Sequence, residues 1–161
     1  MAANSSALRL APVRVSVSKG VRSAVPGPRL LSQWVQASAA GRVRTNMELS
    51  LRVVGAAEGR ALNRRYRGRD YATNVLSFEA SRETRQRDRL LGDLVICAPV
   101  VARESRQQGK SLRAHWAHLV VHGTLHLLGY DHQRKRDALR MERRETRLLR
   151  TLGYRNPYVD G

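Results

Sequence analysis

Residues 115–132 read HWAHLVVHGTLHLLGYDH and contain all five histidines of the chain. Ser111 ahead of this stretch and Gly129 near its end are typical of helix boundaries, so the sequence predicts a helix from residue 111 to about 128. His118, His122 and His126 recur every four residues and therefore lie on one side of that helix. The stretch predicts a helix that carries a row of imidazoles.

The row of histidines predicts a metal site. Two histidines four residues apart on a helix can bind one ion, but eight residues rise about 12 Å, so all three cannot. Gly129 lets the chain turn back, and this turn can bring His132 over His126. We therefore predict His122, His126 and His132 as the metal ligands. Three imidazoles would leave one position open, as in catalytic zinc sites.

The neighbouring residues allow other interpretations. A single histidine on a helix is more often a packing or surface residue, so we expect His118 to pack behind the site and His115 to face solvent or RNA. The spacing also matches the zinc-protease motif HExxHxxGxxH, but Gly123 stands where those enzymes have a glutamate base. A protease mechanism is therefore not expected. Asp131 either orients a ligand or belongs to the turn.

The charge of the chain points to a polyanionic partner. Its 161 residues include 30 Lys and Arg against 13 Asp and Glu, a net charge of +17. Nucleic acid is the first partner to expect and an anionic membrane surface the second. All but three of the basic residues are arginines, which suits phosphate binding, although a genomic bias toward arginine codons explains this ratio equally well. No apolar run approaches the ~18 residues of a membrane span.

The remaining pattern predicts an α+β fold with a single mixed β-sheet of about four strands and helices packed against it. Predicted strands cover residues 13–18, 47–54, 73–78 and 91–97, and predicted helices cover 28–41, 56–66, 99–108, 111–128 and 134–152. The charged stretch Ser81–Arg89 is expected to be a solvent loop or hairpin tip. Cys97 is the single cysteine, so it has no internal disulfide partner, and we expect it to be buried.

The first 47 residues contain no acidic residue. Such a start resembles an organellar transit peptide. The alternating strand at 13–18 and the helix that carries Trp34 favour a folded start instead. We expect residues 1–11 to be a disordered basic tip and residues 12–161 to form a single domain.

Several blocks of the chain resemble the YbeY family, bacterial endoribonucleases that act on single-stranded RNA in rRNA maturation. HGTLHLLGYDH at 122–132 resembles the metal motif of that family. Similar blocks follow the family order over about residues 47–158: NRRYRGRD at 63–70, TNVLSF at 73–78, LGDLVIC at 91–97, AHWAHLVV at 114–121 and LGYRNPY at 152–158.

The resemblance implies site residues and a cofactor. It implies one Zn²⁺ per chain on His122, His126 and His132, in a metal-dependent endoribonuclease domain at residues 12–161. Arg67 and His122 would be the catalytic residues. RNA-backbone contacts are expected from four arginines, Arg64, Arg65, Arg67 and Arg69.

The resemblance also implies a biological role: hydrolysis of RNA phosphodiester bonds, maturation of the 3′ end of 16S rRNA, and ribosome biogenesis and quality control in the bacterial cytoplasm. The expected partners are rRNA and small-subunit assembly proteins, with no membrane and no small-molecule cofactor. The alternative is a non-catalytic RNA-binding assembly factor with a structural zinc site. The sequence does not choose between water and the RNA 2′-hydroxyl as the attacking group.

Overall fold

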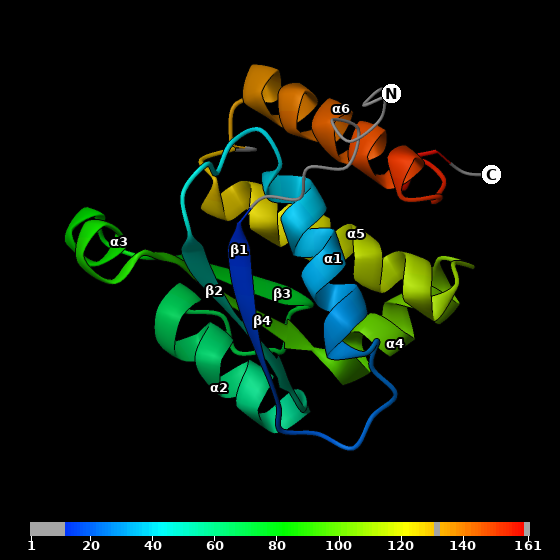
Figure 1. Cartoon of the computed structure of the whole chain (residues 1–161). Helices are drawn as coiled ribbons and strands as arrows, with labels where there is room; N and C mark the ends of the chain where they lie inside the picture. The colour runs from blue at the N-terminus through cyan, green and yellow to red at the C-terminus, as the bar shows by residue number, and fades with distance from the viewer. Residues whose placement is uncertain (1–11, 131–132, 160–161) are drawn as a thin grey trace.

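A computed structural model describes residues 12–130 and 133–159, which form four strands and six helices (Figure 1). The elements follow the order β1 (Val13–Lys19), α1 (Pro28–Ala39), β2 (Met47–Val54), α2 (Ala56–Arg67), β3 (Val75–Glu79), α3 (Arg82–Asp88), β4 (Leu90–Cys97), α4 (Ala98–Gln107), α5 (Leu112–Leu127) and α6 (Lys135–Thr151). The α+β prediction is confirmed.

The four strands form one mixed sheet in the order β1-β2-β4-β3. β1 pairs with β2 and β2 with β4 in parallel, whereas β3 runs antiparallel to β4. Because side chains alternate along a strand, Leu49, Leu51 and Val53 of β2 point to one face and belong to the larger core. The neighbouring Val54 belongs to a second core on the opposite face.

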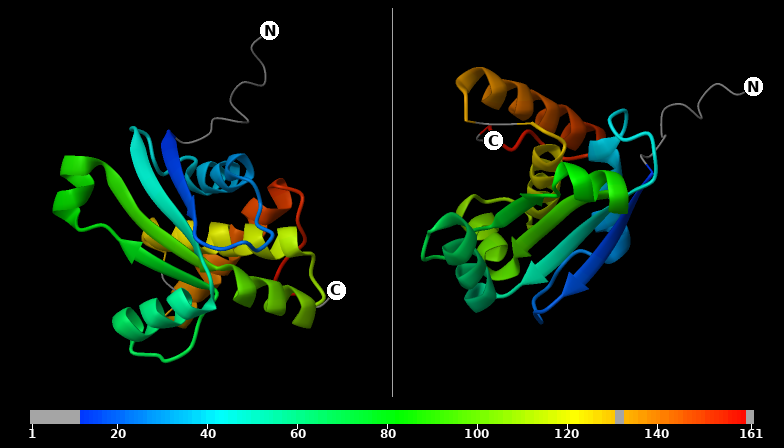
Figure 2. Two further views of the ribbon diagram at one scale, coloured as in Figure 1. Left: turned by 90° about the horizontal axis from the view of Figure 1, so that it is seen from below. Right: turned by 90° about the vertical axis from the view of Figure 1, so that its left-hand side faces the viewer.

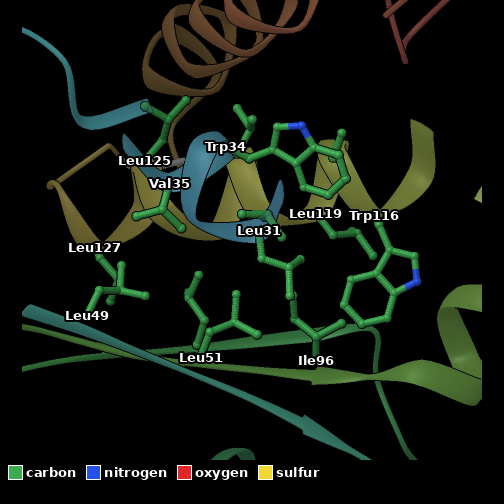
Figure 3. Packing of buried hydrophobic residues seen from close by; sticks show 14 of the residues in the cluster. Leu31, Trp34, Val35, Leu49, Leu51, Ile96, Trp116, Leu119, Leu125 and Leu127 are labelled. Carbon is green, nitrogen blue, oxygen red and sulfur yellow. The ribbon is translucent and has the colours of Figure 1, made fainter. Parts of the chain in front are cut away.

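Helix α5 lies at the centre of the larger core. It contacts β3 and β4 of the sheet, α1 beside it and α6 on its outer side. Figure 3 shows Leu31 and Trp34 of α1 close to Leu119 of α5, above Leu51 and Ile96 of the sheet. Ten of the sixteen residues of α5 are buried, so this helix is apolar on nearly all sides. A polar side chain on this helix therefore lies against a group of a neighbouring segment.

Helix α2 covers the opposite face of the sheet (Figure 2, left). There Cys97 is 1% exposed, and burial raises the pKa of its thiol. The prediction of a buried, unpaired cysteine is confirmed.

The charged stretch at 81–89 forms the tip of the β3–β4 hairpin, as predicted, but residues 82–88 fold as helix α3 rather than as a loop. The Ser81 side chain accepts a hydrogen bond from the Thr84 backbone N–H and so caps the helix. No residue of α3 is buried, so the apolar periodicity that would reveal a helix is missing.

The strand and helix expected near the N-terminus are present as β1 and α1. β1 pairs with β2, and Trp34 of α1 is 2% exposed. The predicted disordered tip, residues 1–11, lies outside the described residues. Within the described part of the chain, no helix is long and apolar enough to cross a membrane.

Gly123 sets how closely α5 approaches the sheet. A Cβ at this position would lie 2.8 Å from Leu94 Cδ2 and 3.3 Å from Val75 Cγ2. We expect Gly123→Ala to lower the free energy of unfolding by about 1–3 kcal/mol in urea denaturation, because the added methyl overfills the core.

Gly20→Ala is the matched control. A Cβ there has its nearest neighbour at 3.7 Å, an ordinary contact, so we expect a change below about 0.5 kcal/mol. Equal stability of the two variants would show that the contact at Gly123 does not limit the approach of α5.

Candidate functional site

A cavity of about 490 Å³ opens between α5, β3, the end of α2 and the C-terminal segment. Its walls include three histidines of α5, two arginines and two tyrosines: His118, His122, His126, Arg67, Arg69, Tyr71 and Tyr158. Imidazole, guanidinium and phenol groups therefore meet in one cavity, although they come from segments up to about 90 residues apart.

The histidines reach the cavity because of their spacing on α5. The ring centroids of His118 and His122 are 6.2 Å apart, and those of His122 and His126 are 6.3 Å apart. Four residues are slightly more than one helical turn, so the three rings form a row along the cavity wall. This part of the sequence prediction is seen directly in the structure.

Glu145 of α6 lies behind this row and is fully buried. Its carboxylate contacts His122 Nδ1 and accepts a hydrogen bond from the Tyr158 hydroxyl. His118 Nε2 lies 3.4 Å from Glu145 Oε2. Burial alone would raise the pKa of Glu145, but the contacts with His118, His122 and Tyr158 outweigh it and bring the pKa down to about 2.

The contact between Glu145 and His122 fixes the orientation of the imidazole ring. A carboxylate that accepts a hydrogen bond from one ring N–H of a histidine selects the tautomer whose other nitrogen can bind a metal. Here that contact uses Nδ1, so Nε2 is the His122 atom suited to an ion in the cavity. The donor chemistry of the site therefore fits a divalent metal ion of the zinc type.

Two overlapping donor sets can be distinguished. His118, His122 and Glu145 can hold a metal ion, since one ligand atom from each lies within 4.8 Å of the others. The predicted set joins His122 to His126 on the next turn and to His132. His132 and its neighbour Asp131 lie outside the described residues, so the triad stays a prediction.

Arg67, at the C-terminal end of α2, extends along the cavity wall. Gly68 follows with φ of 69° and ends the helix there. The Arg67 guanidinium donates to the Ser77 carbonyl at 3.0 Å and lies over the Phe78 ring, 5.3 Å from its centroid. These contacts hold a cation beside the histidines.

The other predicted arginines separate into two groups. Arg69 lines the same cavity and donates to the Tyr71 hydroxyl at 3.1 Å. Arg64 and Arg65 are exposed on α2 and do not belong to the cavity walls.

The prediction that His115 faces solvent or RNA is wrong, because this residue is buried. It is 2% exposed, and its Nε2 lies 2.9 Å from Glu104 Oε1. Burial lowers the pKa of His115, and Glu104 partly opposes this effect. α5 is buried on nearly all sides, so its helical periodicity gave no outward direction for this residue.

Gly123 occupies the position at which the zinc-protease motif has its glutamate base. It faces the sheet rather than the cavity, and even a Cβ there would meet Leu94 at 2.8 Å. A glutamate side chain at this position would therefore collide with the sheet.

Sequence reasoning missed Glu145 and Tyr158. One signal for Glu145 was available: it lies on the same stripe of α6 as the buried Met141, Leu148 and Leu149, where a charged residue needs a partner. Tyr158 lies in the block LGYRNPY, and nothing in that block predicts its contact with Glu145.

We expect Tyr158→Phe to lower the free energy of unfolding by about 1–2 kcal/mol, because the buried Glu145 carboxylate loses a charge-assisted hydrogen bond. Tyr66→Phe is the control, since Tyr66 is 50% exposed and contacts Phe78 through its ring. Thermal denaturation of both variants measures the difference. A Tyr158→Phe protein as stable as the control would contradict the importance of this bond.

Comparison with known proteins places the chain in a family. A family model described as "Endoribonuclease YbeY" matches residues 27–153. A protein of the same description from Aromatoleum aromaticum is 53% identical over 138 residues, which cover 86% of this chain and 84% of that protein. Another from Stenotrophomonas maltophilia is 51% identical over 155 residues, covering 92% and 96%.

A solution structure of a protein from Thermotoga maritima shares the fold. Its TM-score is 0.57 at 21% identity, and the match covers 88% of this chain and 91% of that one. The family match and the identities above lead to one conclusion: this chain belongs to the YbeY endoribonuclease family.

Proposed function

We propose that this protein is a single-strand-specific metallo-endoribonuclease that hydrolyses RNA phosphodiester bonds. One observation carries the proposal: His122, His126 and Arg67 line one cavity in a chain of net charge +17. A nuclease of this kind needs a metal site and a cation beside it for the phosphate, in a molecule that attracts a polyanion.

The proposed metal ligands are His122, His126 and His132, and the proposed ion is one Zn²⁺ per chain. When bound, zinc supplies Lewis-acid polarisation of a phosphoryl oxygen. Glu145 keeps the His122 ring in place through Nδ1. Arg67 offers its planar guanidinium to the phosphate and stabilises the charge that develops there.

Two exposed tyrosines support a single-stranded substrate. Tyr71 is 52% exposed, Tyr158 is 44% exposed, and both line the cavity. Bases that are not paired can stack on such rings, whereas bases within a duplex cannot. Arg69 beside Tyr71 adds a backbone contact, and Arg64 and Arg65 extend the positive surface along α2.

The biological role that we propose is maturation of the 3′ end of 16S rRNA, together with ribosome biogenesis and quality control in the bacterial cytoplasm. rRNA and small-subunit assembly proteins are the proposed partners. Relatives over 50% identical that bear the name endoribonuclease support the enzymatic part of this proposal.

We expect purified protein to cleave a single-stranded RNA oligonucleotide, and a chelator to abolish the cleavage. Arg67→Ala should lower the rate about 10²–10³-fold, because the developing charge loses a fixed donor. Arg82→Ala, at an exposed arginine of α3 outside the cavity, is the control and should retain most of the activity.

The outcomes separate the two functions considered. Binding of RNA without chelator-sensitive cleavage would favour the non-catalytic assembly factor. Cleavage unchanged in Arg67→Ala and in His122→Ala would point to a contaminating nuclease and would overturn the enzyme assignment.

We expect His126→Ala to lose bound zinc and His118→Ala to retain most of it, because the proposed triad contains His126 and not His118. Metal content of the purified variants, measured by mass spectrometry, checks this directly. The donor set His118, His122 and Glu145 makes the opposite prediction, and zinc lost only from His118→Ala would establish that set instead.

A further inference from the structure

The outer face of α6 carries five arginines in a row, here named the arginine stripe: Arg136, Arg140, Arg143, Arg147 and Arg150. All five are exposed, and they recur at alternating intervals of four and three residues. This spacing keeps them on one side of a helix over about 21 Å. The buried residues Met141, Glu145, Leu148 and Leu149 occupy the other side.

The stripe is separate from the cavity. Figure 1 shows α6 as the outermost helix, on the side of α5 away from the sheet, and the right view of Figure 2 agrees. None of the five arginines lines the cavity that contains His122. Glu145, on the buried side of the same helix, contacts His122, so α6 lies between the stripe and this histidine.

The charges of the stripe are not neutralised within the molecule. Among the described residues, none of the five arginines forms an ion pair, and Asp137 and Glu142 of the same helix pair with none of them. Arginines three and four residues apart on a helix repel one another. An ordinary solvated face mixes both signs of charge. A polyanion along the stripe would relieve this repulsion.

The surroundings of the stripe favour RNA over a membrane or a protein. A basic helix binds a membrane by inserting its apolar face, but the apolar face of α6 is buried against α5. A protein interface needs an apolar centre, and the only large apolar side chain exposed on α6 is Leu139. A row of arginines alone suits a phosphate backbone.

The stripe also suits paired rather than single-stranded RNA. Proteins that bind single strands provide aromatic rings for stacking, as Tyr71 and Tyr158 do at the cavity. α6 has no aromatic residue. Double-stranded RNA hides its bases and is recognised through shape and backbone.

We propose that the arginine stripe binds the backbone of a double-stranded RNA segment next to the single strand that enters the cavity. This inference rests on the proposed function only in assuming that a single strand enters the cavity. The stripe would hold the duplex while the adjoining strand passes to His122 and Arg67, so the protein would favour single strands that flank a helix.

The test compares two RNAs and two variants. The RNAs are a single-stranded oligonucleotide and a hairpin that carries the same oligonucleotide as its 3′ tail. One variant replaces the five stripe arginines by glutamine. The control variant makes the same charge change at five exposed arginines elsewhere, Arg14, Arg22, Arg29, Arg44 and Arg82. Dissociation constants are measured between 50 and 200 mM salt.

For the hairpin, we expect the salt dependence of the stripe variant to be weaker than that of the wild type. Five lost phosphate contacts reduce the slope of log K against log salt by up to about 4.5, or about 500-fold over this fourfold range of salt. The control variant should keep most of the wild-type slope. Binding of the single-stranded oligonucleotide should be similar in all three proteins.

Two results would overturn the inference. Hairpin binding unchanged in the stripe variant would leave the stripe free for another partner, such as an acidic protein. An equal loss of affinity for the hairpin and the single strand would show general attraction of polyanions. An equal loss of hairpin affinity in the stripe variant and the control variant would show the same. The proposed function is tested separately, because wild-type protein that binds the hairpin through the stripe but cleaves neither RNA would contradict only the nuclease assignment.

Discussion

A single buried carboxylate, that of Glu145, joins three parts of the structure. A buried charge is costly unless hydrogen bonds or opposite charges compensate it. Glu145 is fully buried, and its partners come from α5 and from the C-terminal segment: His118, His122 and Tyr158. Because only the correct docking of α6 and the C-terminal segment on α5 brings these partners together, the carboxylate selects one arrangement of the three. The same contact orients the histidine that faces the cavity.

The rest of the site follows from the way α5 is enclosed. The sheet and α1 cover its inner side, and α6 covers its outer side. The row of His118, His122 and His126 lines the cavity, and β3 and the end of α2 supply the opposite wall. Gly123 permits this close approach, since it removes the side chain that would collide with Leu94. The position that a protease would use for its base is used here for packing.

The sequence predicted those features that depend on local spacing. Alternation along 47–54 and the four-residue repeat of histidines were enough to place β2 and the row of imidazoles. Contacts between distant segments left no such pattern, so Tyr158 was missed although it lies only 13 residues from Glu145 in sequence. His115 was placed wrongly because α5 has no polar face from which an outward direction follows. The charged helix α3 lacks apolar periodicity, and its capping residue Ser81 was the only local sign of it.

The enclosure of α5 has a consequence for how the protein folds and unfolds. A helix that is apolar on nearly every side has little stability of its own in water and depends on its packing partners. The cavity walls come from residues 63–77, residues 118–126 and Tyr158, so they meet only when distant segments have docked. The site is thus a product of cooperative folding. Loosening of α6 alone would expose Glu145, release His122 and dismantle the site while the sheet remained intact.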